Sequence, residues 1–202
     1  MMHLFRFTWV IGPLFLLGCA SKHSAPPSAE TTTTPPPVAV IKKTRQLSSW
    51  EIQGLMAVKS PKKSFSANLI WLQQGPHHYH LRLMGPFGNG TVLINRQGEN
   101  VTYQDDHTRI TAPEASSLLY KKTGVRLPVD ALYHWIKGLP TAAPITQATY
   151  DKQHHLLTLQ QQGYILQYAS YESINGYALP KKITLNGHHL MVKLIIKHWQ
   201  LS

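Results

Sequence analysis

Few residues of this chain have the types and spacing that enzyme catalysis requires. Nine carboxylates are spread over 202 residues, and only Asp105 and Asp106 are adjacent, whereas acid–base catalysis needs two positioned groups. The sequence contains no Gly-rich phosphate loop, GxSxG elbow or HExxH motif. Residues 60–63 match the SxxK pattern of penicillin-binding enzymes, but they include a proline at a strand turn where that serine needs a helix start. We expect no enzymatic activity, with an enzyme on the same scaffold as an alternative.

The twelve histidines offer only one plausible arrangement for a metal. His78 and His80 are two residues apart on an expected strand and could face one ion together, whereas adjacent histidines at 154–155 and 188–189 point to opposite faces. No cysteine or fixed acidic partner completes a ligand set. We expect no metal and no cofactor, with zinc at His78 and His80 as the alternative.

The single cysteine, Cys19, lies in the context of a lipidation site. Residues 1–18 have a weakly basic start and an apolar run from Phe7 to Leu17, which is too short for a spanning helix and is typical of a secretory signal peptide. The following tetrad, LLGC, resembles the bacterial lipobox, in which the cysteine sulfur receives a diacylglyceryl group. We expect an acyl anchor at Cys19, with a plain signal peptide and an incidental cysteine as the alternative.

The residues after Cys19 indicate where the anchor is placed. In lipoproteins an Asp at the next position favours the inner membrane, so Ala20 implies the periplasmic face of the outer membrane. Residues 19–47 are rich in Pro, Thr and Ala and are expected to form a flexible linker. The net charge of +11 suits an anionic partner, and charge alone does not choose among lipid head groups, nucleic acid and an acidic protein. Nucleic acid is not expected for an exported, tethered chain.

Residues 48–202 have the pattern of one antiparallel β domain. Phe65, Ala67, Leu69 and Trp71 alternate with mostly polar residues, and this period of two is that of strands with one buried face. Turn signals such as Asn175-Gly176 separate the segments. We expect about eleven strands, at residues 50–59, 64–74, 78–84, 91–96, 99–104, 107–111, 145–151, 154–160, 163–169, 180–186 and 189–199.

Residues 112–139 interrupt the strands with two short helices. Glu114–Thr123 lacks alternation and stops at Gly124, and Pro128 suits the first turn of a second helix that Gly138 can close. The fold class that follows is mainly β, an unclosed antiparallel β-barrel with the helical insert as a lid. A barrel of this size that is only partly filled leaves an apolar interior.

One expected turn carries an unusual aromatic residue. Residues 85–88 read GPFG and fit a β-turn with Pro86 second and Gly88 fourth, which points Phe87 outward. An exposed ring at a loop tip indicates an interaction site. Packing of Phe87 back onto the sheet is the alternative.

Several stretches together resemble one family. They are the lipobox ending at Cys19, ANLIWLQQ at 67–74, LRLMGPFG at 81–88, TGVRLPV at 123–129 and LYHWIKGLP at 132–140. Their order and spacing are similar to those of LolB, the outer-membrane lipoprotein receptors of Gram-negative bacteria. The resemblance covers the chain from its signal peptide to its final strand, and implies an unclosed barrel whose helices form a lid.

This resemblance implies a function in lipoprotein transport. The family accepts lipidated proteins from the soluble periplasmic carrier LolA and inserts them into the outer membrane without a nucleotide. The implied partners are a LolA-type carrier, acylated lipoprotein cargo and outer-membrane lipid, and we expect a monomer. A tethered amphiphile-binding lipoprotein without insertion activity, and a purely structural lipoprotein with a filled barrel, are the alternatives.

The resemblance and the architecture also assign residues. Phe87, between Pro86 and Gly88, matches the family's exposed apolar loop residue and is expected to enter the membrane surface and help cargo leave. Ordinary core packing is the alternative for each residue expected to line the acyl-chain cavity. Those residues are Phe65, Leu69, Trp71, Leu81, Leu83, Val92, Ile94, Leu118, Leu132 and Ile136.

Overall fold

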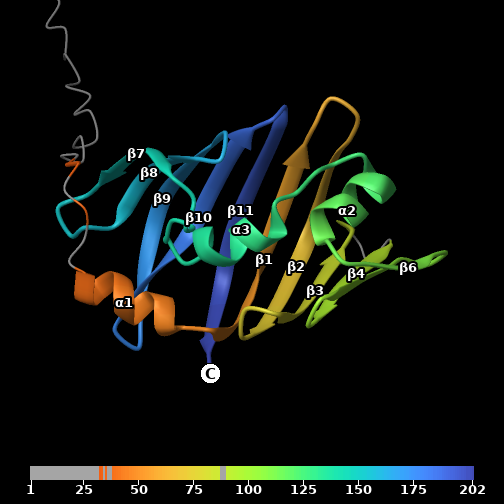
Figure 1. Ribbon diagram of the computed structural model, residues 1–202, viewed down its shortest axis with the longest axis horizontal. Helices are drawn as coiled ribbons and strands as arrows, with labels where there is room; N and C mark the ends of the chain where they lie inside the picture. Colours follow the sequence, from red (N-terminus) through yellow and green to blue (C-terminus); the bar gives the residue numbers. More distant parts are fainter. Residues whose placement is uncertain (1–31, 34, 36–37, 87–89) are drawn as a thin grey trace, which may run out of the picture.

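The computed structural model describes residues 32, 33, 35, 38–86 and 90–202. These residues form one sheet of eleven antiparallel strands and three helices (Figure 1). The expected fold class, mainly β with an unclosed antiparallel sheet and a helical insert, is therefore confirmed. The expected lipidation site Cys19, and Phe87 and Gly88 of the expected turn, lie outside the described residues.

The strand boundaries agree closely with those expected from alternation. The main difference is at β9 and β10, which continue to a tight turn at Asn175 and Gly176, where φ is 51° and 74°. Two consecutive residues with positive φ form the hairpin turn that matches strand twist, so the ladder continues up to it. The strands are β1 Ser49–Lys59, β2 Ser64–Gln74, β3 His78–Met84, β4 Thr91–Gln97, β5 Asn100–Gln104, β6 Arg109–Ala112, β7 Ile145–Tyr150, β8 Leu156–Gln161, β9 Tyr164–Ile174, β10 Tyr177–Gly187 and β11 Leu190–Leu201.

The strand order explains why helices cross the sheet. The order is β6-β5-β4-β3-β2-β1-β11-β10-β9-β8-β7, so the first and last strands pair at the centre while β6 and β7 form the two edges. Because β6 and β7 are consecutive in the chain, residues 113–144 must pass from one edge to the other. This crossing segment contains α2 (Ala115–Thr123) and α3 (Val129–Trp135), which lie over one face of the sheet (Figure 1).

The central pairing of β1 with β11 depends on one glycine. The register shifts between Gln53 and Gly54, which marks a bulge. A Cβ at Gly54 would collide with the carbonyl oxygen of Ile195 on the neighbouring strand. Glycine therefore permits the close approach of the two backbones where the ends of the chain join the sheet.

The core lies between the covered face of the sheet and the crossing segment. Alternate residues of the strands are buried, for example Trp50, Ile52, Met56 and Val58 of β1. The expected alternation of Ala67, Leu69 and Trp71 in β2 is confirmed, since all three are buried. From the other side α3 contributes its own apolar residues, Val129, Leu132 and Trp135.

Nine residues of the segment expected to be linker, 19–47, instead form helix α1 (Val38–Gln46). Thr44 and Leu47 are buried, and Lys43 donates from Nζ to the Gly176 carbonyl at 2.9 Å. The helix follows the last proline of the tract and itself contains neither Pro nor Gly, which are the strongest helix breakers. Its β-branched residues, such as Val40 and Ile41, favour a helix only weakly, so contacts with the rest of the domain contribute to its stability. Among the described residues, no helix combines the length and apolar character needed to span a bilayer.

Candidate functional site

An apolar groove opens between α2 and one half of the sheet. Its volume is about 320 Å³, within the range of pockets that hold small ligands. Val58, Phe65, Leu83 and Val92 line it from four neighbouring strands, since alternation places these residues on the covered face. Leu119 of α2 lines the opposite side. The groove therefore presents mainly hydrocarbon to whatever enters it.

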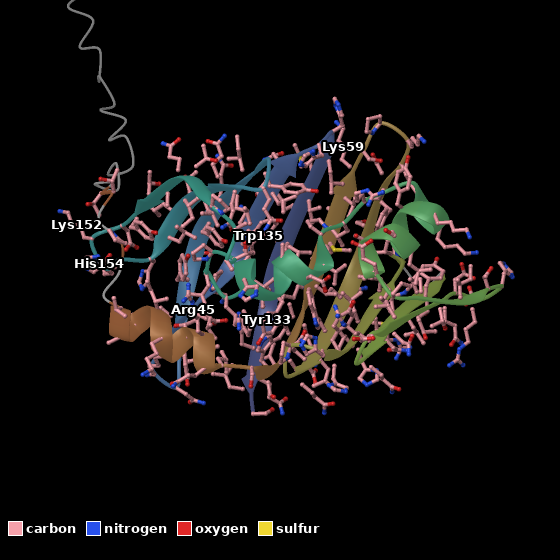
Figure 2. All side chains as sticks on the ribbon, in the orientation of Figure 1. Arg45, Lys59, Tyr133, Trp135, Lys152 and His154 are labelled. Atoms are coloured by element: carbon pink, nitrogen blue, oxygen red, sulfur yellow. The ribbon has the colours of Figure 1, made fainter. Side chains whose placement is uncertain are left out.

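A second, nearly closed cavity lies under α3. Its volume is about 20 Å³, which is room for about one water molecule. Leu132 and Ile136 fill the space from above, and Trp71 and Leu81 line it from the sheet. Figure 2 shows Trp135 and Tyr133 in this segment over the middle of the sheet. In the structure the lid is therefore shut over the centre of the sheet, while the groove beside it stays open.

The carboxyl end of α3 is fixed by buried hydrogen bonds. Trp135 Nε1 donates to Gln161 Oε1 at 3.0 Å, and Tyr168 donates from its hydroxyl to the Trp135 carbonyl at 3.0 Å. Gln161 also accepts from the Thr141 backbone N–H at 3.0 Å and donates to the Ala143 carbonyl at 2.6 Å. The side chain of Gln161 therefore binds both Trp135 of α3 and the segment that follows α3, at Thr141 and Ala143.

Lys137 joins the lid to the N-terminal segment. Its Nζ donates to the Leu47 carbonyl at 2.9 Å and lies 4.0 Å from the centroid of the Tyr133 ring. Only 2% of the residue is exposed. Burial lowers the pKa of Lys137 from 10.5 to about 8, because the charged amine loses its hydration. The connection between α1 and β1 is therefore in direct contact with the lid.

The amino end of α3 is held more weakly. Arg96 of β4 pairs with Asp130 at 2.6 Å, and the Asp130 side chain is 61% exposed. Exposed ion pairs contribute about 0–1 kcal/mol, whereas each hydrogen bond at the other end joins groups that are mostly buried. Among polar contacts, therefore, the carboxyl end of α3 is held more firmly than the amino end, where Val129 is buried by apolar packing.

The structure brings nine of the ten expected cavity residues to these two spaces. Phe65, Leu83, Val92 and Ile94 line the groove. Leu69, Trp71, Leu81, Leu132 and Ile136 line the closed cavity. Leu118 is buried in α2 but lines neither space.

Sequence reasoning missed several lining residues. Val58 has the same parity as Trp50 and Ile52, so the alternation in β1 could have identified it. The sequence alone does not show which of Leu118 and Leu119 faces the groove. Helix α2 has only nine residues, which is too few turns for the spacing of its apolar residues to define one buried side. Val125 and Leu127 lie in the connection after α2, where no period applies.

The hairpin between β3 and β4 begins and ends at the rim of the groove. Gly85, Pro86 and Gly90 line its opening, and Gly85 donates its backbone N–H to the Gly90 carbonyl at 3.0 Å. Pro86 is exposed. The segment that carries Phe87 is therefore attached where the groove opens.

The histidines that could face one metal lie on the outer face of β3. His78 and His80 are both exposed, and His80 Nδ1 lies 2.8 Å from Asn95 Oδ1. The described part of the chain contains no group of three or more His, Cys, Asp or Glu that could hold a metal ion.

An open antiparallel sheet with an apolar groove and a crossing helical lid defines a class of protein that shelters a hydrophobic ligand. A family model described as outer membrane lipoprotein LolB matches residues 48–199. The outer-membrane lipoprotein LolB of Ectopseudomonas mendocina is 35% identical over 199 residues, which cover 98% of this chain and 96% of that protein. That of Pseudomonas putida strain GB-1 is 37% identical over 199 residues, covering 98% and 95%. The chain belongs to the LolB family.

The expected family and location are thereby confirmed. The chain is an outer-membrane lipoprotein of the lipoprotein-localization system, and a trafficking receptor rather than an enzyme. A LolA superfamily protein from Nitrosomonas europaea has a similar fold, with a TM-score of 0.54 and 10% identity over 81% of this chain and 92% of that one. At that identity the likeness concerns the fold alone.

Proposed function

We propose that this chain receives lipoproteins from a LolA-type periplasmic carrier, shelters their acyl chains and inserts them into the outer membrane. The acyl chains enter the groove beside α2 and then occupy the covered face of the sheet. Anchoring occurs through lipid on Cys19. No nucleotide is needed, because the chains move between surfaces that are all apolar.

The observation that carries this proposal is the open apolar groove of about 320 Å³ in a chain of the LolB family. Three acyl chains exposed to water cost on the order of 30 kcal/mol, at about 0.8 kcal/mol per CH₂. A receptor must therefore cover the chains throughout the transfer. An apolar lining makes no directional bonds, so it suits cargoes that share only their lipid.

The two spaces in the structure become one when the lid moves. Met56 and Leu127 line both the groove and the closed cavity, so the two are separated by little more than these side chains. Lifting the amino end of α3 withdraws Leu132 from the centre of the sheet and breaks only the Arg96–Asp130 pair among the polar contacts described above. An arriving acyl chain supplies the apolar contacts that Leu132 loses.

A labelling experiment tests whether the groove takes the acyl chains. A soluble form beginning at Ala20 keeps every described residue and lacks the only cysteine. In this form Val92→Cys, in the groove, is reacted with a bulky maleimide after folding. We expect the unlabelled variant to take a lipoprotein from the carrier like the unmutated soluble form, and the labelled variant to do so at least tenfold more slowly.

The matched control is Ile165→Cys, which introduces the label on an exposed position of β9 on the uncovered face of the sheet. Labelling there should leave transfer unchanged. Equal transfer by the two labelled proteins would show that the groove is not used. Failure of the unmutated soluble form to take any lipoprotein would favour a tethered amphiphile binder.

We also propose that Phe87 enters the membrane surface during insertion. Burying such a ring contributes about 1.5–3 kcal/mol, which orients a domain that lipid already anchors. Phe87→Glu should accept cargo from the carrier and then fail to insert it into membranes. Normal insertion by a folded Phe87→Glu protein would refute this role.

A further inference from the structure

Four cations belong to the two segments that border the groove on the α2 side, and one of them, Lys63, lines it. Lys62 and Lys63 lie in the turn between β1 and β2, Lys121 lies in α2, and Arg126 follows it. The two segments are neighbours, since a Cβ placed on Gly124 at the end of α2 would lie 3.4 Å from Lys62 Cδ. We call these four residues the basic rim.

The basic rim is exposed, and it forms no ion pair with the part of the chain that the structure describes. All four residues are exposed, and among the described residues no carboxylate oxygen lies within 4.0 Å of their charged groups. Two carboxylates lie nearby. Hydrogen bonds within their own turns lower the pKa of Glu114 and of Asp105, with smaller contributions from the charge of Arg126 on Glu114 and from that of Lys122 on Asp105. Glu114 accepts from the Ser117 hydroxyl, and Asp105 accepts from the backbone N–H groups of residues 107 and 108.

An exposed aromatic ring lies among these cations. Tyr120 of α2 is 46% exposed, with Lys62 Nζ at 6.0 Å and Arg126 Cζ at 5.1 Å from its ring centroid. On the other side Lys63 lies over the Phe65 ring at 5.9 Å, and both residues line the groove. Tyrosine flanked by Lys and Arg is the composition found where proteins meet the head groups of a bilayer.

We propose that the basic rim binds the phosphate groups of anionic phospholipids and holds the opening of the groove against the outer membrane. Tyr120 then lies at the level of the head groups. This inference rests on the proposed function in one respect, namely that acyl chains leave through this opening. Its physical reason is that an acyl chain passing from the groove into a bilayer avoids water only if the two apolar regions adjoin.

The test measures binding of the soluble form from Ala20 to vesicles of phosphatidylglycerol mixed with phosphatidylcholine. The rim variant carries Lys62→Gln, Lys121→Gln and Arg126→Gln, and leaves Lys63 unchanged because Lys63 lines the groove. Each lysine or arginine near an anionic surface contributes roughly fivefold in affinity, so we expect the three substitutions to weaken binding roughly a hundredfold. Binding of the unmutated form should also fall as salt rises, because salt screens surface charges.

The matched control removes the same charge from the other side of the sheet. Lys182, Lys193 and Lys197 are exposed residues of β10 and β11 on the uncovered face. Their triple substitution to Gln should leave vesicle affinity within about fivefold of the unmutated form. Equal losses from the two triple variants would show a response to net charge alone and would overturn the proposal. A single Tyr120→Ser variant should bind more weakly while keeping its salt dependence.

A second measurement separates this inference from the proposed function. Uptake of a lipoprotein from the carrier is followed without vesicles, where the rim variant should behave like the unmutated form. Loss of uptake with unchanged vesicle binding would show that the rim contacts the carrier protein, and would overturn the proposal. If the unmutated form takes no cargo but its vesicle binding depends on the rim as expected, the proposed function fails while the lipid site stands.

Discussion

Lys137 makes a prediction about stability and pH that can be worked out from the structure. Burial lowers its pKa from 10.5 to about 8, and no carboxylate oxygen in the described residues lies within 4.0 Å of it. Between these two values the folded chain has released the proton that the unfolded chain still holds. Because the unfolded state then binds more protons, the free energy of unfolding rises with pH in this window.

The perturbation is Lys137→Met, which keeps the length of the side chain and removes the titrating amine. Integrating the two titrations gives a contribution from Lys137 of about 2 kcal/mol between pH 8 and pH 10. Burial raises the pKa of several tyrosines, including Tyr103 to about 12, and this lowers stability toward pH 10. The contribution of tyrosines that do not contact Lys137 is the same in both proteins and cancels in their difference. Tyr133 is in contact with Lys137, and burial raises its pKa, so the difference is read below pH 10, where tyrosines in the unfolded chain keep their protons.

The assay is urea unfolding of the soluble form and of the variant at a series of pH values. The difference in unfolding free energy, unmutated minus variant, should grow by about 2 kcal/mol across the window. Lys193→Met serves as a control, because it removes an exposed lysine from the uncovered face of the sheet. If the difference in unfolding free energy between the unmutated protein and Lys137→Met did not change with pH, the lowered pKa of Lys137, and with it the burial of its amine, would be refuted.

Two further predictions concern the lid and the central strand pair. Gln161→Leu leaves the Trp135 indole N–H and the Thr141 backbone N–H without their acceptor, so it should destabilise the fold by about 2–4 kcal/mol in urea unfolding. The exposed Gln167→Leu should cost under about 0.5 kcal/mol, and similar losses from both would contradict the glutamine contacts. Gly54→Ala places a methyl group against the Ile195 carbonyl and should destabilise by about 1–3 kcal/mol. A thermal midpoint unchanged by Gly54→Ala would count against the tight bulge.

Much of the fold can be predicted from local sequence patterns, namely the alternation of apolar residues and the residues at turns. Alternation identifies a strand residue by residue, so Ala67, Leu69 and Trp71 could be assigned to one buried face from their spacing alone. Turn chemistry at Asn175-Gly176 fixed a hairpin, although the strands on either side are longer than expected. The start of β10 is expected at residue 180, because a proline is unfavourable in the interior of a strand. In the structure Pro180 lies inside β10, where a register shift accompanies it.

What could not be predicted depends on contacts between distant segments. Two hydrogen bonds to distant residues stabilise helix α1 and the residue that follows it. Lys43 donates from Nζ to the Gly176 carbonyl, and the Leu47 carbonyl accepts from Lys137 Nζ. Neither contact has a local signal in a Pro- and Thr-rich tract. The closed position of the lid also depends on tertiary packing. The sequence shows that Leu132 and Ile136 are apolar, but it does not show whether they fill the interior of the sheet or line an open cavity.

The two ends of the sheet have a geometric consequence for delivery. Helix α1 and the C-terminus lie at one end of the sheet (Figure 1), whereas β1 runs to Lys59 at the other (Figure 2). The groove is near this second end, since Val58, Lys63 and Phe65 line it. A strand of eleven residues spans about 37 Å, and the thirteen residue steps from Cys19 to Thr32 reach at most about 45 Å. With lipid on Cys19, as proposed above, this reach exceeds the length of the sheet, so the tether is long enough for the opening to face the membrane that anchors the domain. The reach of the tether and the length of the sheet are therefore matched dimensions, and the number of residues before Thr32 sets which postures the domain can adopt.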